Sequence, residues 1–199
     1  MKRTDIINEL IKKYNYKSYL EVGTQDPKSN FDKINAEYKV SVDPFPRGKV
    51  TFVGTSDEYF NSISDDVMFD IIFIDGLHHY DQVLIDIDNS FKHLNKNGII
   101  VCHDCLPTHI KMQEREDHGG EWTGDVWKAI AYLRMNNANY DIRVVDTDYG
   151  CGLIKWGTND LFEPRIGLDD LDYKFFINNR KLLMNVISKE DFMLWINGQ

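Results

Sequence analysis

Carboxylate and imidazole side chains gather in two short segments of this sequence. Asp75 is followed by His78 and His79, and His103 directly precedes Asp104. An imidazole with its ordinary pKa of about 6.5 can accept a proton near neutral pH. Sets of histidines and aspartates also bind divalent metals such as manganese, iron or zinc. These residue types therefore indicate chemistry that uses a general base, a metal ion, or both.

Both segments follow runs of apolar residues that are typical of buried strands. Residues Phe69–Ile74 are almost continuously apolar, as expected of a strand buried on both faces. In an open α/β sheet, ligands bind beyond the carboxyl ends of the strands, and polar residues also follow three earlier strand-like runs. These residues are Glu21, Gly23 and Thr24, then Asp43, and then Gly54, Thr55, Ser56 and Asp57.

The types of these strand-end residues suit a nucleoside-containing cofactor. An acidic residue after the second strand, here Asp43, can accept hydrogen bonds from ribose hydroxyls. Gly23 lets a ligand approach the backbone closely. The sequence contains neither G-x-G-x-x-G nor G-x-x-x-x-G-K-[ST], which argues against a pyrophosphate cofactor or a nucleoside triphosphate.

The elements that must position these residues follow from the alternation of apolar runs and amphipathic stretches. We expect strands at residues 18–22, 38–42, 50–53, 69–74 and 99–102, and helices at 1–16, 31–36, 55–63, 80–94 and 126–133. Residues 142–145 and 152–156 are too close in sequence for a helical crossover and should form an antiparallel hairpin. Asn97-Gly98 is expected to form a turn, and the tail at 169–197 to be helical.

This pattern predicts an α/β fold, with a doubly wound, seven-stranded, mostly parallel sheet, helices on both faces and an antiparallel C-terminal hairpin. We expect one domain over residues 1–199, made of an N-terminal helix (1–17), a core (18–156) and a C-terminal extension (157–199). The long polar segment at 106–120 is expected to be a lid or binding loop.

The composition narrows the classes of partner. The net charge of −9 argues against a nucleic-acid substrate, because phosphate binding needs a basic face. No apolar run approaches the ~20 residues of a membrane span, and the N-terminus lacks a secretory signal, so we expect a cytoplasmic protein. The three cysteines, Cys102, Cys105 and Cys151, are expected to be reduced, with a redox-active Cys102/Cys105 pair as the alternative. The sequence does not fix the oligomeric state and is compatible with a homo-oligomer.

Four motifs, taken in their order along the chain, resemble those of class I S-adenosylmethionine (SAM) dependent methyltransferases, and most closely the methyltransferase domain 24 group. They are Glu21-Val22-Gly23, Asp43-Pro44, residues 54–58 and residues 74–80. His103-Asp104-Cys105, residues 124–130 and residues 148–152 fit the same group, so the resemblance covers about residues 19–154. Pro27 stands where many relatives have a second glycine.

The resemblance implies SAM as the cofactor and assigns it a set of binding residues. Glu21 and Gly23 would line the methionine end, with Thr24 in the same set, and Asp43 would bind the ribose. Thr55, Ser56 and Asp57 would border the adenine, and Asp75 and Gly76 would lie near the methyl donor.

Related macrolide-sugar O-methyltransferases hold magnesium with carboxylates at the ends of the fourth and fifth strands, and carry a histidine three residues after the first carboxylate. Asp75, His78 and Asp104 match that arrangement, while His103 stands in place of a carboxylate. The resemblance therefore implies His78 as the general base, Asp75 as a second catalytic residue, and Asp75, Asp104 and His103 as ligands of Mg²⁺ or Mn²⁺. His79 and Trp122 are predicted to contact the substrate.

The sequence thus predicts a SAM-dependent O-methyltransferase that acts on a hydroxyl of a small molecule or of a glycan sugar. One alternative is a non-haem iron oxygenase or a metal-dependent hydrolase that uses the His/Asp cluster. Another is a nucleotide-sugar glycosyltransferase, because Asp86-Ile87-Asp88 and Asp146-Thr147-Asp148 have the D-x-D pattern. A binding domain without catalysis would leave the cluster without a purpose.

Overall fold

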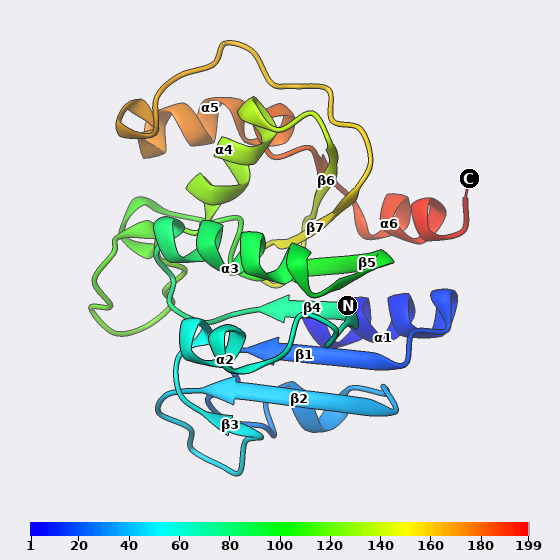
Figure 1. Cartoon of the computed structure of the whole chain (residues 1–199). Helices are drawn as coiled ribbons and strands as arrows, with labels where there is room; N and C mark the ends of the chain where they lie inside the picture. The colour runs from blue at the N-terminus through cyan, green and yellow to red at the C-terminus, as the bar shows by residue number, and fades with distance from the viewer. Residues whose placement is uncertain (199) are drawn as a thin grey trace.

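The computed structural model describes residues 1–198 and contains one eight-stranded sheet in the order β3-β2-β1-β4-β5-β7-β6-β8 (Figure 1). The strands are β1 (Ser18–Val22), β2 (Tyr38–Asp43), β3 (Phe52–Val53), β4 (Phe69–Ile74), β5 (Leu94–Cys102), β6 (Tyr140–Val145), β7 (Cys151–Trp156) and β8 (Val186–Ile187). Strands β1 to β5 pair in parallel, and β7 runs antiparallel to both β5 and β6. The predicted doubly wound sheet and its antiparallel hairpin are confirmed.

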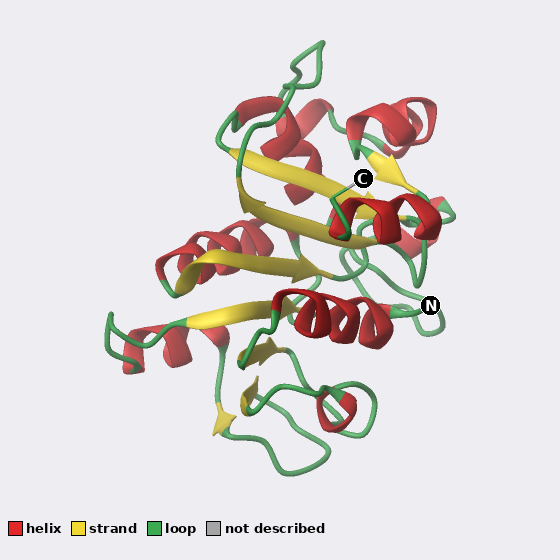
Figure 2. Ribbon diagram, turned by 90° about the vertical axis from the view of Figure 1, so that its right-hand side faces the viewer, coloured by secondary structure: helices red, strands yellow, loops and turns green. Residues whose placement is uncertain are grey.

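Helices cover both faces of this sheet (Figure 2). They are α1 (Arg3–Tyr14), α2 (Ser56–Ser62), α3 (Tyr80–Lys92), α4 (Trp127–Asn136), α5 (Tyr173–Leu183) and α6 (Lys189–Ile196), with short 3-10 turns η1 (Phe31–Lys33), η2 (Ile110–Gln113) and η3 (Leu168–Asp170). One buried cluster joins the sheet to α2, α3, α4 and α5, and a second joins it to α1 and α6. No helix within residues 1–198 has the length and apolar character needed to cross a membrane.

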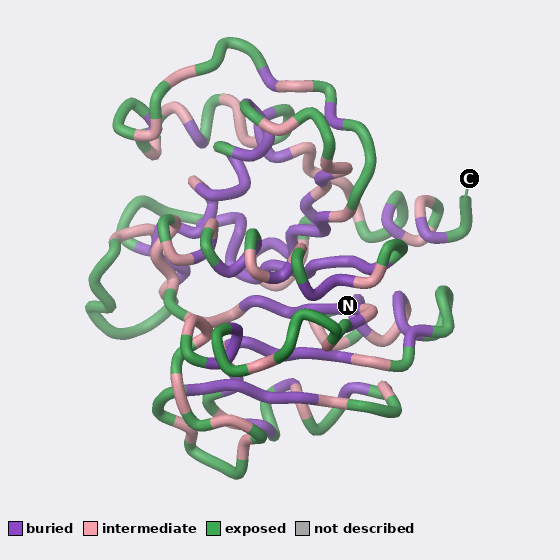
Figure 3. The backbone as a smooth tube through the Cα atoms, viewed as in Figure 1, coloured by how far each residue is buried: buried purple, intermediate pink, exposed green. Residues whose placement is uncertain are grey.

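The apolar run of β4 shows why the central strands are buried on both sides (Figure 3). Ile72 and Ile74 belong to the first cluster, whereas Ile71 and Phe73 belong to the second. Successive side chains of a strand point to opposite faces of the sheet, so each face of β4 must be apolar. This arrangement holds the carboxyl end of β4, and with it Asp75, at a fixed position.

Several element boundaries differ from those predicted. The expected turn at Asn97-Gly98 was wrong: both residues lie inside β5, whose pairing with β4 is irregular between Phe69 and Ile71. The expected helix at 31–36 shrinks to the single turn of η1. The tail is not continuously helical, because residues 186–187 pair with β6 as an eighth strand between α5 and α6.

Candidate active site

The predicted cofactor residues come together around one cavity of about 920 Å³ at the carboxyl ends of the parallel strands. The residues of the predicted cofactor set that line it are Glu21, Gly23, Thr24, Asp43, Thr55, Ser56, Asp57, Asp75 and Gly76. They lie in the last residues of β1 and β2, in the loops after β1, β3 and β4, and in the first turn of α2, and these four strands are neighbours in the sheet. The sheet order thus explains why residues more than fifty positions apart in sequence share one cavity.

Gly23 forms the floor of the cavity, where the loops after β1 and β4 touch. Its φ is +85°, and a Cβ at this position would lie 2.1 Å from the carbonyl oxygen of Asp75. Two backbone hydrogen bonds hold these loops in place: Gly23 N–H donates to Val42 O (2.9 Å), and Asp75 N–H donates to Val22 O (2.9 Å). Only glycine combines this backbone angle with this contact.

Asp43, at the end of β2, has a carboxylate that the backbone holds in place. It accepts hydrogen bonds from Gln25 N–H (2.8 Å, Oδ2) and from Phe45 N–H (2.7 Å, Oδ1). Each carboxylate oxygen can accept more than one hydrogen bond. The side chain therefore retains acceptor capacity toward the cavity that it lines.

Glu21, the last acidic residue of β1, is buried at the opposite side of the Gly23 loop. Its carboxylate accepts hydrogen bonds from the Tyr19 hydroxyl and from the Asn30 side-chain amide (2.8 Å). Burial raises the pKa of Glu21 to about 7, although both hydrogen bonds act in the opposite direction. A cationic ligand group in the cavity would favour the ionised carboxylate.

The first turn of α2 and the side chain of Gln82 form the far wall of the cavity. Thr55 caps α2 by accepting a hydrogen bond from Glu58 N–H (3.2 Å). Gln82 Nε2 donates to Asp57 Oδ1 (3.2 Å) and to Asp86 Oδ1 (3.1 Å). Burial raises the pKa of Asp86 to about 6.

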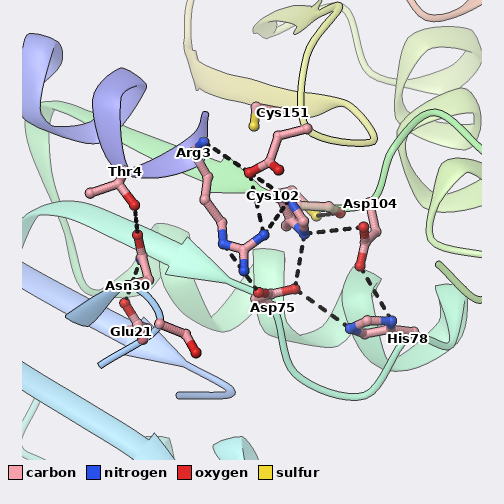
Figure 4. A network of polar contacts seen from close by, with 12 residues as sticks. Arg3, Thr4, Glu21, Asn30, Asp75, His78, Cys102, Asp104 and Cys151 are labelled. Carbon is pink, nitrogen blue, oxygen red and sulfur yellow. Dashed lines mark hydrogen bonds and ion pairs between the residues drawn. The ribbon is translucent and has the colours of Figure 1, made fainter. Parts of the chain in front are cut away.

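A cluster of two aspartates and two histidines lies where the β4 and β5 loops meet (Figure 4). His78 lies between the aspartates, with Nε2 3.5 Å from Asp75 Oδ1 and Nδ1 3.4 Å from Asp104 Oδ2. His103 Nδ1 lies 3.2 Å from Asp75 Oδ1 and 3.1 Å from Asp104 Oδ1. Four of the five side chains that the sequence singled out after β4 and β5 are thus in direct contact.

The charges of the cluster shift the pKa of its members in opposite directions. Burial alone would lower the pKa of His78, but the hydrogen bond to Asp75 and its negative charge raise it above the ordinary value. Burial likewise opposes the charged form of Asp75, and the neighbouring His103 and His78 nevertheless lower the pKa of this carboxyl. Proton acceptors and donors are therefore held within a few ångströms of one another.

Three of these residues present a set of atoms that fits a divalent metal ion. Asp75, His78 and Asp104 each offer one ligand atom, and these atoms lie within 4.8 Å of one another. His78 Nδ1 is buried and has no hydrogen-bond partner, as expected of an atom that can accept a further ligand. His103, which the sequence placed among the ligands, turns its other nitrogen, Nε2, toward Arg3 Nη1 (3.0 Å) and Asp148 Oδ2 (3.4 Å).

Sequence reasoning did not place Arg3 at the site, and it named Asp148 only within the motif at residues 148–152 and within a D-x-D triplet. Arg3 starts α1, and its Nη1 donates to Asp148 Oδ2 (3.3 Å) in the turn between β6 and β7. Asp148 lies at the active-site edge because β7 runs antiparallel to its neighbours, so the strand begins where the parallel strands end. The hairpin prediction contained this signal, whereas an arginine in the first turn of an amphipathic helix looked like a solvated residue.

The D-x-D pattern that suggested a glycosyltransferase does not form a paired site. Asp148 faces Arg3 and His103, but Asp146 forms an ion pair on the surface with Arg180 (2.8 Å). In the other triplet Asp86 is buried, whereas Asp88 is exposed and pairs with Lys92. The two acids of each triplet therefore point to different surroundings.

The predicted lid is fastened to the start of α3 by Arg115. The Arg115 guanidinium pairs with Asp81 (2.8 Å) and Asp125 (3.2 Å), and its carbonyl oxygen lies 3.0 Å from His79 Nε2. His79, predicted to contact the substrate, thus contacts the lid and is not among the cavity residues. It also occupies the N-cap position of α3.

Trp122 follows the lid and lines the cavity. Its indole stacks on the His78 ring, with 4.6 Å between ring centroids and 19° between the ring planes. Trp122 Nε1–H donates to Glu114 O (2.7 Å), which fixes the indole in the loop. Trp127, in contrast, is fully buried in the core. The three cysteines are free and buried.

Comparison with known proteins also points to methyltransferases. Residues 14–105 match the family described as "Methyltransferase domain". No curated protein sequence matches the chain. The structure is similar to that of Podospora anserina methyltransferase PaMTH1 bound to S-adenosylhomocysteine (SAH), with 15% identity, a TM-score of 0.56 and 76% of each chain covered.

A second similar structure is the Streptomyces achromogenes O-methyltransferase TomG, involved in tomaymycin synthesis and solved in complex with SAM. It has 12% identity and a TM-score of 0.57, and the match covers 77% of this chain and 79% of TomG. These likenesses establish the fold, and the family match covers residues 14–105, which is less than half of the chain. The chain therefore has the fold of SAM-bound and SAH-bound methyltransferases, and this segment is similar to a methyltransferase domain.

Proposed function

We propose that this chain transfers the methyl group of SAM to a hydroxyl of a small molecule or of a glycan sugar, with His78 as the general base and a divalent metal at Asp75 and Asp104. The observation that carries the proposal is the meeting of two sets of residues in one cavity. The residues predicted to bind the nucleoside and the four residues of the His/Asp cluster line the same cavity. An oxygen acceptor needs a base beside the methyl donor, and the His78 imidazole would supply it here.

The residues around Gly23 fit the cofactor. Gly23 has no side chain at the point where its backbone meets that of Asp75. Asp43 would accept hydrogen bonds from the ribose hydroxyls, and Thr55, Ser56 and Asp57 would border the adenine. Glu21 and Thr24 would line the methionine end, where the carboxylate of Glu21 faces the cationic amine.

His78 is the residue that can take the proton of the acceptor hydroxyl. It lines the cavity, its ring is fixed by Trp122 on one face, and its Nδ1 is free of hydrogen bonds. When bound, SAM supplies an activated methyl group, and a divalent ion lowers the pKa of the hydroxyl that attacks it. Asp75 and Asp104 would hold the ion and orient His78 between them. Trp122 would contact the acceptor.

Calorimetry with the purified full chain tests the proposal. We expect SAM and SAH to bind with micromolar affinity, and Asp43→Asn to weaken binding about ten-fold by removing charge-assisted hydrogen bonds to the ribose. Asp65→Asn, at a residue of the loop between α2 and β4 that does not line the cavity, is the matched control and should bind SAM like the wild type. The absence of SAM binding at millimolar concentration, with and without Mg²⁺ or Mn²⁺, would refute the proposal.

The class of methyl acceptor can be identified with the same purified protein. Transfer of a radioactive methyl group from SAM to a panel of hydroxylated small molecules and reducing-end glycans, with His78→Gln as the inactive reference, would identify the class. Transfer only to amines or thiols would refute the O-methyltransferase assignment while leaving the donor assignment intact.

A further inference from the structure

Arg3 places a fixed positive charge beside the proposed metal site. It is the first residue of α1, and Figure 4 shows its side chain reaching from this helix toward Asp75. Its backbone N–H donates to Asp148 Oδ2 (3.0 Å), and Nη1 of its guanidinium approaches the same oxygen at 3.3 Å. The side chain is three-quarters buried, with an exposed fraction of 25%. Arg3 is therefore held at both its main chain and its side chain.

Arg3 shares one carboxylate with the metal site. Its Nε lies 4.0 Å from Asp75 Oδ2, while Asp75 Oδ1 faces His78 and His103. A divalent ion held by Asp75 and Asp104 would lie close to this guanidinium. Two cations near one carboxylate repel each other, and the repulsion is strong where burial limits screening by solvent.

We propose that Arg3 is a positioning residue that competes with the divalent ion for Asp75 and thereby sets the metal affinity of the cluster. The proposal rests on the metal site of the proposed function. Asp148 gives the guanidinium a second anion to bind, so Arg3 can remain in place when Asp75 turns to the metal. Arg3 then neutralises the charge of Asp75 when metal is absent, and gives up this carboxylate to the metal when metal binds.

The experiment titrates Mn²⁺ alone into the full chain, without any acceptor, and measures the binding affinity by calorimetry. Arg3→Gln should bind Mn²⁺ at least about ten-fold more tightly than the wild type, because one nearby positive charge is gone. Arg3→Lys keeps the charge and should stay near the wild-type affinity. The control is Arg143→Gln, which removes the same charge from β6, where Arg143 pairs with Asp141 rather than with the cluster. It should change the affinity less than about two-fold.

Thermal unfolding supplies a second readout that a purely structural role would not produce. Arg3→Gln leaves Asp75 and Asp148 without their shared cation, so its Tm should be lower than that of the wild type without metal and should rise more on addition of Mn²⁺. Arg3→Met, which keeps an apolar stem, repeats the measurement should the glutamine variant not fold.

Equal or weaker Mn²⁺ binding by the uncharged Arg3 variants would overturn the inference, as would an equal change in Arg143→Gln. Titration of SAH into the same samples separates this outcome from failure of the proposed function. If SAH binds and Mn²⁺ binds neither the wild type nor the variants, both the inference and the proposed metal fail while the methyl donor stands. If SAH does not bind, the proposed function itself fails.

Discussion

A single methyl group added at Gly23 tests how the floor of the active site is built. Gly23 has a φ of +85°, and a Cβ here would lie 2.1 Å from Asp75 O and 2.4 Å from Gly76 Cα. Both neighbours are backbone atoms at the end of the buried strand β4. The overlap can be relieved only by moving the loop after β1 away from β4, which would also disturb the cavity.

The expected loss of stability has two parts. The left-handed conformation costs a residue with a Cβ about 1–2 kcal/mol, and overpacking against a fixed backbone adds about 1–3 kcal/mol. Gly23→Ala should therefore lower the free energy of unfolding by about 2–5 kcal/mol. Domains of this kind are stable by about 5–15 kcal/mol, so most of the variant should remain folded at low temperature.

Gly119 offers a matched control for the cost of the left-handed conformation alone. Its φ is +84°, but a Cβ there would have no heavy atom within 4 Å. Gly119→Ala should lose only about 1 kcal/mol, since backbone strain is partly offset by the reduced entropy of the unfolded chain. Gly76→Ala is a second control, because its nearest contact would be an ordinary 3.4 Å to Val22 Cγ1.

Urea unfolding followed by circular dichroism measures all three variants, and SAH binding reports on the cavity. We expect Gly23→Ala to be the least stable and to bind SAH weakly even where it is folded. Equal losses for Gly23→Ala and Gly119→Ala would refute the argument from the backbone contact, because the two positions share their φ and differ only in their surroundings.

Three further predictions concern charge and the lid. The pKa of Glu21 is raised to about 7, so SAM binding should strengthen as pH rises through 7 and the carboxylate ionises, and Glu21→Gln should abolish this pH dependence in calorimetry. The pKa of Asp86 is raised to about 6, so ionisation of this buried acid lowers stability as pH rises from about 4 to 6. Asp86→Asn should stabilise the protein by up to about 3 kcal/mol at pH 7.5 and by little at pH 4 in urea unfolding, unlike the exposed control Asp88→Asn. Arg115→Ala should cost less than about 1 kcal/mol of stability, because its ion pairs are largely exposed, but should speed hydrogen exchange and proteolysis across residues 106–121. Unchanged protection there would show that Arg115 does not fasten the lid.

Local patterns in the sequence predicted the central part of the fold well. The bounds of β4 follow from its apolar run, because a strand covered on both faces has few other solutions. Thr55 caps α2 with Glu58 three residues later, a pattern that is complete within one turn. The polar residues after the strands share a cavity because parallel strands end at one edge of the sheet.

Features that depend on distant contacts were not predictable in this way. Asn97-Gly98 has the local signature of a turn, but it lies within β5, at the irregularity where the pairing of that strand with β4 shifts register. His78 and His79 are neighbours of the same type, and only the fold shows that one faces Asp75 while the other faces the lid. Arg3 could be placed only once α1 was known to lie against the turn between β6 and β7.

The contact between Arg3 and Asp148 joins residues that are 145 positions apart. The residues predicted to bind the cofactor, in contrast, lie between Glu21 and Gly76 and need only β1 to β4. During synthesis from the N-terminus, the donor half of the cavity can therefore form well before the β6–β7 turn is made, whereas the contact between Arg3 and Asp148 must wait for that turn. In a refolding experiment, recovery of SAH binding should accordingly precede the burial of Arg3.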